Sequence, residues 1–319
     1  MNRSAACWLA VCVSMLAALS TARAGWPPRV FAPYMFLGSG DRFQLTDCDD
    51  ACSQKYYTLA FIISDKSNNP AWYGRIPMER NLYTNQITTI RARGGDVLVS
   101  FGGEDGREIA LVETNVAALE AKYQSVMDRY HFTWLDFDIE GRALQNTEAN
   151  RRRNAALARL QARNPGLTIS YTLPVDPTGI PDDAQRLLAD ARNKGLKVHS
   201  ANIMTMDFGT KFSGGKKMSD VSIASALKAR EQCAPIDPAI QIGLTPDIGQ
   251  NDVKSEVFSL DDARELIRWA KTQPWVCSVS FWSSNRDNGR PGRNNSNIRS
   301  GIQQEPWAFT KIFQTFTTP

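Results

Sequence analysis

Runs of apolar and β-branched residues alternate with segments of helical periodicity along almost the whole chain, and this alternation limits the possible folds more than any other feature. Strands that are apolar on both faces are typical of a parallel sheet covered by helices. We therefore predict the α/β class and a (β/α)8 TIM barrel formed by a single domain, with a doubly wound open sheet as the alternative. The eight predicted strands are residues 29–36, 56–63, 96–103, 132–141, 167–175, 200–209, 239–249 and 276–287.

The segments that follow these strands carry the signals of helices. Residues 110–130 place Leu111, Leu119 and Tyr123 on one face, with the period expected for a helix that packs on a sheet. Residues 181–195 begin with proline and acidic residues and end in a glycine, the usual asymmetry of a helix. Further helices are predicted at residues 146–164, 219–233, 259–274 and 305–316, with a weaker one at residues 81–93.

The amino-terminal residues have the composition of a signal peptide. Arg3 precedes an apolar stretch, residues 5–19, that is too short to span a bilayer, and an A-x-A cleavage motif follows it. We expect residues 1–24 to be removed and residues 25–319 to form the barrel. The mature protein is then expected to be secreted (extracellular or periplasmic), with no membrane-spanning segment.

The charge of the chain is nearly balanced. The sequence has 37 Lys and Arg against 33 Asp and Glu, a formal charge of +4, and loss of Arg3 and Arg23 with the leader lowers it to +2. Such a balance gives no reason to expect binding to nucleic acid or to an anionic membrane. The two histidines, His131 and His199, are far apart in sequence, so we expect no metal site and no cofactor. We expect a monomer.

Four cysteines remain after the leader is removed, an even number that favours two disulfides in an oxidising compartment. Cys48 and Cys52 are one helical turn apart, which gives a Cα separation of about 6 Å, within reach of a disulfide. Cys233 ends a predicted helix and Cys277 begins the last predicted strand, so both are expected at the amino-terminal face of the barrel. We predict the pairs Cys48–Cys52 and Cys233–Cys277.

The run TWLDFDIEG, residues 133–141, places three carboxylates on alternating positions of a strand that otherwise reads as buried. Side chains alternate between the two faces of a strand, so Asp136, Asp138 and Glu140 share one face while the apolar residues between them face the helices. The acids therefore point into the barrel. Glu140 lies at the carboxyl end of its strand, where barrel enzymes carry their chemistry.

Three neighbouring carboxylates in a site of low polarity cannot all ionise cheaply, so they share protons and at least one pKa rises. A glutamic acid that stays protonated near neutral pH can act as a general acid. The main alternative is a two-metal nuclease site, because FDIEG is similar to an acidic motif of proofreading exonucleases. The predicted leader and barrel count against that alternative, and the apolar neighbours count against acids that are solvated on an edge strand.

LDFDIE resembles the second half of the D-x-x-D-x-D-x-E signature of family 18 glycoside hydrolases, the chitinases. SFGG, residues 100–103, is similar to the S-x-G-G motif of this family at the third strand, and MTMDFG, residues 204–209, is similar to its M-x-Y-D motif at the sixth. TPDIGQND, residues 245–252, and SFWSSNRD, residues 280–287, resemble the seventh and eighth strands of small bacterial secreted members. The resemblance covers essentially all of residues 25–319.

The resemblance implies a secreted, endo-acting chitinase that cleaves the β-1,4 bonds of chitin and chito-oligosaccharides with retention of configuration. In this role Glu140 is the general acid, Asp138 hydrogen-bonds first Glu140 and then the acetamido N–H of the substrate, and Asp136 keeps the proton balance beneath them. The family uses no enzyme nucleophile. The acetamido oxygen of the substrate attacks the anomeric carbon and forms an oxazolinium ion.

The resemblance also implies a set of substrate-binding side chains: Tyr34, Phe61, Met204, Met206, Asp207 and Trp282. Among these, Trp282 corresponds to the aromatic floor beneath the distorted sugar at subsite −1. Ser100, Gly102 and Gly103 are expected to shape the cavity wall below the acids.

The sequence departs from the family pattern at several positions. Thr133 and Trp134 stand where the signature has Asp and Gly, early in the strand and away from the catalytic end, so we expect structural compensation there. Met206 stands where the family has a Tyr whose hydroxyl steadies the acetamido carbonyl. We expect Tyr171 or Gln241 to supply the missing hydroxyl or amide; without such a group, turnover is expected to be low.

Two other functions share this motif. One is an endo-β-N-acetylglucosaminidase that acts on N-glycans, and the other is a catalytically weak chitin-binding lectin on the same barrel. The lesion typical of such lectins is loss of the terminal glutamate, and Glu140 is present. The pattern assigns no role to Asp247. Few residues separate the seventh strand from the next helix, so we expect a shallow, open groove without the small domain that processive members insert there.

Overall fold

The structure of the protein is a computed structural model that describes residues 25–37, 44–290 and 297–318. The expected signal peptide, residues 1–24, lies outside the described residues, so its removal stays a prediction. Within the described part of the chain, no helix is both long enough and apolar enough to cross a membrane.

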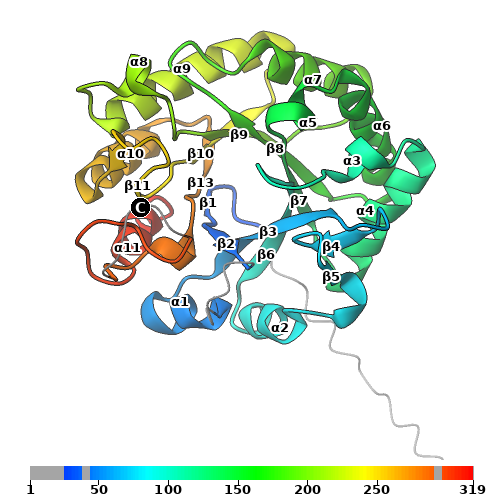
Figure 1. The fold of residues 1–319 in the computed structure, drawn as a ribbon, viewed down its shortest axis with the longest axis horizontal. Helices are drawn as coiled ribbons and strands as arrows, with labels where there is room; N and C mark the ends of the chain where they lie inside the picture. The colour runs from blue at the N-terminus through cyan, green and yellow to red at the C-terminus, as the bar shows by residue number, and fades with distance from the viewer. Residues whose placement is uncertain (1–24, 38–43, 291–296, 319) are drawn as a thin grey trace, which may run out of the picture.

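Parallel strands close into a barrel at the centre of the molecule, as the sequence predicts (Figure 1). Each strand pairs with its neighbours in chain order, and the first pairs with the last. The prediction of a single-domain (β/α)8 TIM barrel is confirmed. The strands are β1 (Val30–Phe31) continued by β2 (Tyr34–Phe36), then β3 (Tyr56–Ser64), β6 (Asp96–Gly102), β7 (Trp134–Asp138), β8 (Thr168–Pro174), β9 (Ser200–Met204), β10 (Gln241–Thr245) and β13 (Val276–Val279).

The first strand closes the barrel because it is split in two at Pro33. Its first half pairs with β13, and the Ala32 amide donates to the Val279 carbonyl at 3.1 Å, whereas its second half pairs with β3. Pro33 has no amide hydrogen to donate, but its carbonyl accepts from the Thr58 amide at 3.0 Å. One short segment thus bonds to both neighbours, so the ring has no free edge at this point.

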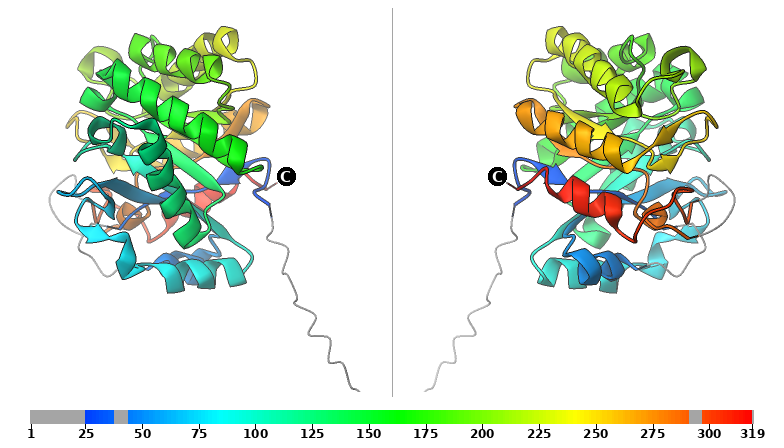
Figure 2. Two further views of the ribbon diagram at one scale, coloured as in Figure 1. Left: turned by 90° about the vertical axis from the view of Figure 1, so that its right-hand side faces the viewer. Right: turned by 90° about the vertical axis from the view of Figure 1, so that its left-hand side faces the viewer.

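Helices cover the outside of the barrel (Figure 2), and the structure has a helix at every predicted position. The predicted helix at residues 110–130 is divided in two, because Asn115 caps the longer part by accepting from the Ala118 amide at 3.0 Å. The helices are α1 (Leu45–Cys52), α2 (Thr84–Ala92), α3 (Ile109–Val112), α4 (Val116–Tyr130), α5 (Gly141–Gln145), α6 (Thr147–Arg163), α7 (Asp182–Asn193), α8 (Thr210–Ser213), α9 (Met218–Ile236), α10 (Leu260–Thr272) and α11 (Ala308–Gln314).

Aromatic rings join the outer face of the strands to the helices. Phe101 of β6 and Phe137 of β7 stack with ring centroids 5.1 Å apart, and Tyr123 of α4 contacts both edge-on. All three rings are fully buried. Because Phe137 lies between Asp136 and Asp138 in the strand, its burial in the helical layer holds the two carboxylates on the opposite, inner face.

Two hairpins extend from the carboxyl ends of strands. β4 (Pro70–Trp72) and β5 (Ile76–Pro77) continue the sheet from β3 in antiparallel fashion. β11 (Gly249–Gln250) and β12 (Val257–Phe258) form a separate two-stranded sheet. The second hairpin occupies the short segment after β10, where the sequence leaves no room for an inserted domain.

Two tryptophans plug the amino-terminal end of the barrel. Trp26 packs edge-on against Trp134 with ring centroids 5.0 Å apart, and its indole N–H donates to the Thr133 hydroxyl at 3.1 Å. The Trp134 indole N–H donates to the Ser170 hydroxyl at 2.9 Å. The departures at residues 133 and 134 therefore have a structural compensation, as expected, at the end of the barrel far from Glu140.

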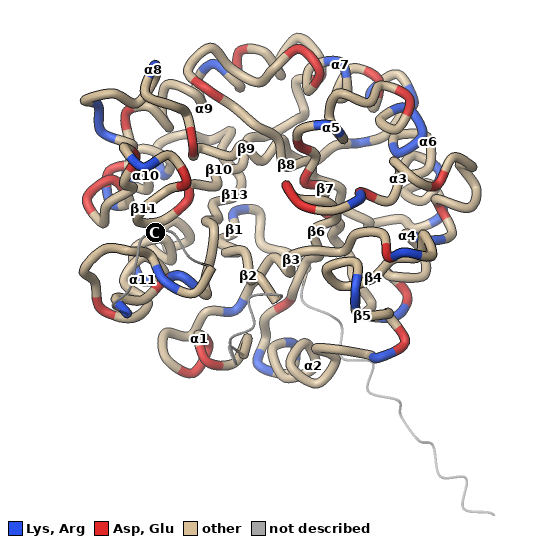
Figure 3. The backbone as a smooth tube through the Cα atoms, viewed as in Figure 1, with Lys and Arg blue, Asp and Glu red and all other residues tan. Residues whose placement is uncertain are grey.

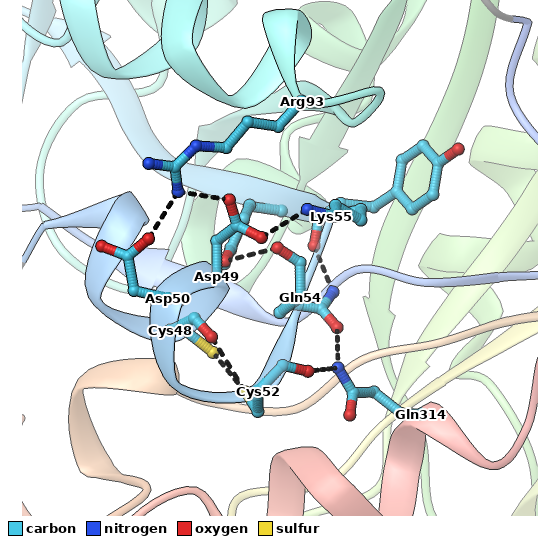
Figure 4. A network of polar contacts seen from close by, with 10 residues as sticks. Cys48, Asp49, Asp50, Cys52, Gln54, Lys55, Arg93 and Gln314 are labelled. Atoms are coloured by element: carbon cyan, nitrogen blue, oxygen red, sulfur yellow. Dashed lines mark hydrogen bonds and ion pairs between the residues drawn. The ribbon is translucent and has the colours of Figure 1, made fainter.

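The predicted disulfides are not formed, because all four cysteines are free thiols. The sulfur atoms of Cys48 and Cys52 lie 3.3 Å apart at the end of α1 (Figure 4), farther than the ~2.05 Å of a disulfide bond. Cys233 lies on the buried face of α9, and the Cys277 thiol faces the Ile242 carbonyl at 3.8 Å. The Cys233–Cys277 pair was predicted because both residues lie near the same end of the barrel. That shared position is not enough to form a bond between their sulfur atoms.

A buried ion pair anchors the loop that follows β6. The Glu108 carboxylate accepts from Arg153 of α6 at 2.6 Å, and both side chains are buried. The same carboxylate caps α3 by accepting from the Ala110 amide at 2.9 Å, and the Tyr123 hydroxyl donates to it at 3.3 Å. This pair therefore fixes the segment that leaves the carboxyl end of β6.

We predict that Glu108→Ala lowers the free energy of unfolding by about 3–5 kcal/mol, because it leaves Arg153 as a buried cation without its partner. The matched control is Glu148→Ala, which removes an ion pair with Arg151 whose two side chains are 68% and 58% exposed. The control should change the free energy by less than about 1 kcal/mol. Urea denaturation of both variants measures the difference, and equal effects would contradict the role given to the buried pair.

Candidate active site

Asp136 is held at the centre of the barrel by four hydroxyl groups. Ser170 donates to its carboxylate at 2.6 Å, Ser100 at 2.7 Å, Thr172 at 2.9 Å and Tyr34 at 3.0 Å. Burial raises the pKa of Asp136, and these hydroxyl donors oppose that rise because they stabilise the ionised form. Both carboxylate oxygens of Asp136 therefore accept hydrogen bonds from the protein, and Asp136 is not free to contact a substrate.

Asp138 and Glu140 lie above Asp136 and interact with each other. Burial raises the pKa of Asp138 well above its ordinary range, and the charges of Glu140 and Asp136 raise it further. Burial also raises the pKa of Glu140, but a hydrogen bond from Asp138 opposes this rise. A carboxyl with a raised pKa keeps its proton to higher pH, so this pair can hold a proton and donate it to a ligand.

The pair opens onto a cavity of about 950 Å³ at the carboxyl end of the barrel. Asp138 and Glu140 both line it, and the Oδ1 atom of Asp138 is buried with no hydrogen-bond partner. Glu140 directly precedes α5, so its side chain lies where β7 ends and the helix begins. A ligand in this cavity can thus reach both an unused acceptor and a proton donor.

The two glycines of the SFGG segment let β6 and β3 approach this pair closely. A Cβ on Gly102 would lie 2.0 Å from the carbonyl oxygen of Asp138, and its φ of +102° is one that other residues rarely adopt. A Cβ on Gly103 would lie 2.9 Å from the Phe61 ring. Gly102 therefore lines the cavity beside Asp138, whereas Gly103 packs against Phe61 and Ser100 is buried against Asp136, outside the cavity lining.

Aromatic side chains form one side of the cavity. Trp282 stacks on Phe61 with an interplanar angle of 11° and ring centroids 5.6 Å apart. Tyr34 and Phe36 contact the Trp282 ring at centroid distances of 6.0 and 5.4 Å. Tyr34, Phe61 and Trp282 are thus brought together as predicted, and Phe36 is an additional member. A flat apolar surface of this kind suits the face of a sugar ring.

Three predicted residues reach the cavity from the end of β9. Met204 and Met206 line it, as does Asp207. The Asp207 carboxylate accepts from the Val253 amide at 2.9 Å, which ties it to the β11–β12 hairpin. Partial burial raises the pKa of Asp207. The MTMDFG segment therefore supplies one apolar and one acidic part of the same wall.

Two predicted residues do not reach the cavity. Gln241 is the first residue of β10, so it lies at the amino end of the barrel, opposite Glu140. Tyr171 faces the helical layer, where its buried hydroxyl donates to Asn154. Both predictions are wrong. The direction of β10 places Gln241 at the end of the barrel away from the cavity, and the alternation of side chains along β8 turns Tyr171 towards the helices. Neither supplies the hydroxyl that is absent at Met206.

A buried ion pair that the sequence analysis missed completes the wall. Asp247 and Arg286 are both buried and contact each other at 2.7 Å, and both line the cavity. Arg286 also donates to the carbonyls of Ile248 and Gln250. Burial raises the pKa of Asp247, and the guanidinium opposes this rise. The sequence signal for this pair was a charged residue in each of two otherwise buried segments, TPDIGQND and SFWSSNRD. A buried charge needs a partner of opposite charge.

We predict that Asp138→Asn stabilises the protein at neutral pH, because it removes a carboxyl whose pKa is raised by folding. For such a group the folded state is favoured below the unfolded pKa of about 3.9 and loses stability as the pH rises from there. The melting temperature of the variant, relative to wild type, should therefore be higher at pH 7 than at pH 3.5 by about 2–4 °C. A difference that does not change with pH would contradict the raised pKa.

The chain is similar to known proteins in both sequence and structure. No protein-family model matches the chain. It is 32% identical to the catalytic domain of the chitinase from Pyrococcus furiosus, over 91% of this chain and 95% of that one, with a TM-score of 0.82. Solved family 18 (GH18) chitinases at 13 to 16% identity share the fold, with TM-scores of 0.57 to 0.61.

Two longer proteins are related in sequence. The chain is 31% identical to the probable bifunctional chitinase/lysozyme of Escherichia coli and 31% identical to endochitinase 11 of Metarhizium anisopliae. The matches cover 94% and 84% of this chain but 36% and 54% of those proteins. Since the Pyrococcus domain is matched over almost its whole length, the chain belongs to the chitinase family. Its fold is the barrel of the solved family 18 chitinases.

Proposed function

We propose that this chain hydrolyses the β-1,4 bonds between N-acetylglucosamine units of chitin and chito-oligosaccharides, as an endo-acting, retaining enzyme. The observation that carries the proposal is that Asp138 and Glu140 both line a large cavity with an aromatic wall, where burial raises the pKa of each carboxyl. The related Pyrococcus domain has been crystallised with chito-oligosaccharides, which supports the same ligand class here.

The proton shared by the pair can serve the reaction in the following order. An N-acetylated sugar at subsite −1 offers its amide N–H to Asp138, which passes its proton to Glu140 and becomes the acceptor. Glu140 then protonates the glycosidic oxygen while the acetamido oxygen attacks the anomeric carbon. Water opens the oxazolinium ion, and Glu140 takes the proton of that water. The protein thus needs only one acid within reach of the bond that breaks.

The positions of the other two carboxylates support this division of roles. Asp136 is occupied by hydroxyl donors, so it can balance the charge of Asp138 but cannot attack a sugar. Asp138 has an unused buried oxygen, which matches the single N–H that an acetamido group presents. We infer that the −1 sugar lies against Trp282, with its acetamido group directed at Asp138.

We propose further that the protein is exported, that residues 1–24 are its cleaved signal peptide, and that it acts as a monomer. Export and cleavage are supported by the basic start, the short apolar stretch and the A-x-A motif of the sequence. We also propose endo action. Only the short β11–β12 hairpin lies between β10 and α10 beside the cavity, so no inserted domain encloses the groove there.

A second candidate is a chitin-binding protein with weak turnover. The observation that favours it is Met206, whose thioether cannot donate a hydrogen bond to the acetamido carbonyl. The presence of Glu140 with a raised pKa favours the enzyme, since a protein that only binds has no need of a proton donor.

We predict that Glu140→Gln lowers kcat on chito-oligosaccharides by at least about 10²–10⁴-fold, because the amide keeps the shape of the side chain but has no acid proton. Binding measured by calorimetry should stay within about tenfold of wild type. Asp138→Asn should also cost activity severely, and Asp136→Asn less. Glu148→Gln, on the exposed face of α6, is the control and should be fully active. An active Glu140→Gln enzyme would refute the assignment.

We predict that no bond is cleaved when the sugar at subsite −1 is glucosamine, because deacetylation removes the nucleophile and leaves Glu140 untouched. The measurement is to digest partially deacetylated chitosan and to identify the new reducing ends, which should all be N-acetylglucosamine and should be released as the β-anomer. If glucosamine occurs at these ends as often as N-acetylglucosamine, substrate assistance is wrong and so is the role of Asp138.

A further inference from the structure

The cavity is far more acidic than the chain that forms it. Seven carboxylates and two guanidinium groups line it, whereas the whole sequence has a formal charge of +4. Two of the carboxylates, Asp138 and Glu140, share a proton, and Asp247 is neutralised by Arg286. The proposed chemistry on a neutral polysaccharide uses no further negative charge, so the remaining acids need another explanation.

Four exposed carboxylates, here named the acidic rim, surround the opening. Glu104 and Asp105 belong to the loop after β6, Asp207 follows β9, and Asp252 lies in the β11–β12 hairpin. Within the described ranges none of the four makes an ion pair, although Arg75 also lines the cavity. Figure 3 shows acidic segments beside β7 and beside β11, on different sides of the centre of the ring.

The loops that carry the rim are held in place by buried contacts. The Glu108–Arg153 ion pair anchors the segment that carries Glu104. On the other side, the Asp207 carboxylate accepts from the Val253 amide, which holds it next to Asp252. Like charges fixed around one opening repel each other and create a negative potential inside it. This arrangement is stabilised when a cation enters.

The shape of the site favours an extended cationic ligand over a single ion. Across the part of the chain that the structure describes, no three acidic, His or Cys side chains are close enough to hold a metal ion. The rim acids are instead spread along a cavity of about 950 Å³ that has an aromatic wall. Asp138 also lines this cavity, and its Oδ1 atom is buried without a hydrogen-bond partner, so a ligand in the cavity can donate a hydrogen bond to it.

We propose that the acidic rim selects partially deacetylated chitin, in which protonated glucosamine units occupy the subsites on either side of an N-acetylated sugar at −1. The inference rests on the proposed function, since that function fixes what lies at −1. An amine on a neighbouring unit meets the rim as a cation, while its ring can still stack on the aromatic wall. The same rim repels a polysaccharide with acidic substituents, so lysozyme-type activity on peptidoglycan is expected to be low.

The experiment compares two hexasaccharides, one fully N-acetylated and one in which half of the units are deacetylated. Calorimetry with Glu140→Gln measures binding without turnover. At about 20 mM salt the deacetylated chain should bind about tenfold more tightly, and at about 500 mM salt this preference should fall towards unity, because the Debye length shrinks from roughly 20 Å to 4 Å.

A rim variant and a matched control locate the effect. Adding Glu104→Gln, Asp105→Asn and Asp252→Asn to the Glu140→Gln protein should reduce the preference at least about fivefold. The control carries the same change of charge on exposed helix faces, with Asp128→Asn, Glu148→Gln and Asp220→Asn, and should keep the preference of the parent protein.

The outcomes separate this inference from the proposed function. Equal binding of the two hexasaccharides at low salt, or a preference that the rim variant keeps, would overturn the inference even if wild type hydrolyses the acetylated chain. Preferential binding by the rim with no hydrolysis of either chain would overturn the proposed function alone. An oligolysine of equal charge that bound as tightly would overturn the inference as well, by showing that the rim binds polycations regardless of the sugar.

Discussion

One constraint governs the catalytic end of this barrel: three carboxylates on a single strand have to be kept in a buried interior. Asp136 meets it with four hydroxyl donors, and the network continues around the ring, from Thr245 to Asn202 and from Asn202 to Thr172. Burial raises the pKa of all three carboxyls, so Asp138 and Glu140 cannot both ionise cheaply beside Asp136. The shared proton of Asp138 and Glu140 follows from this, and so does a cost in stability that the protein carries at neutral pH.

The parts of the structure that follow from periodicity could be predicted from the sequence. Alternation of apolar strands and amphipathic helices leads to the barrel, and alternation within TWLDFDIEG places the acids on its inner face. The same rule, applied to SYTLP, would have turned Tyr171 outward. Strand direction would likewise have placed Gln241 at the wrong end. Both residues carry a suitable hydrogen-bonding group, but the chemistry of a side chain does not determine which way it points.

What could not be predicted depends on partners that are distant in sequence. The Asp247–Arg286 pair joins the segments after β10 and β13, and Glu108 pairs with Arg153 of α6. The acidic rim likewise draws its members from three separate loops that meet only because the barrel closes. The cysteines show the opposite limit. Cys48 and Cys52 lie close together, as their spacing predicts, but no bond is formed between them.

The shared proton is the central claim, and a carboxyl-carbon NMR titration of protein labelled at Asp and Glu tests it most directly. The account predicts that Asp138 and Glu140 both titrate above the ordinary values of about 3.9 and 4.3, and that each resonance senses the titration of the other. Independent titration of both groups at ordinary values would contradict the account.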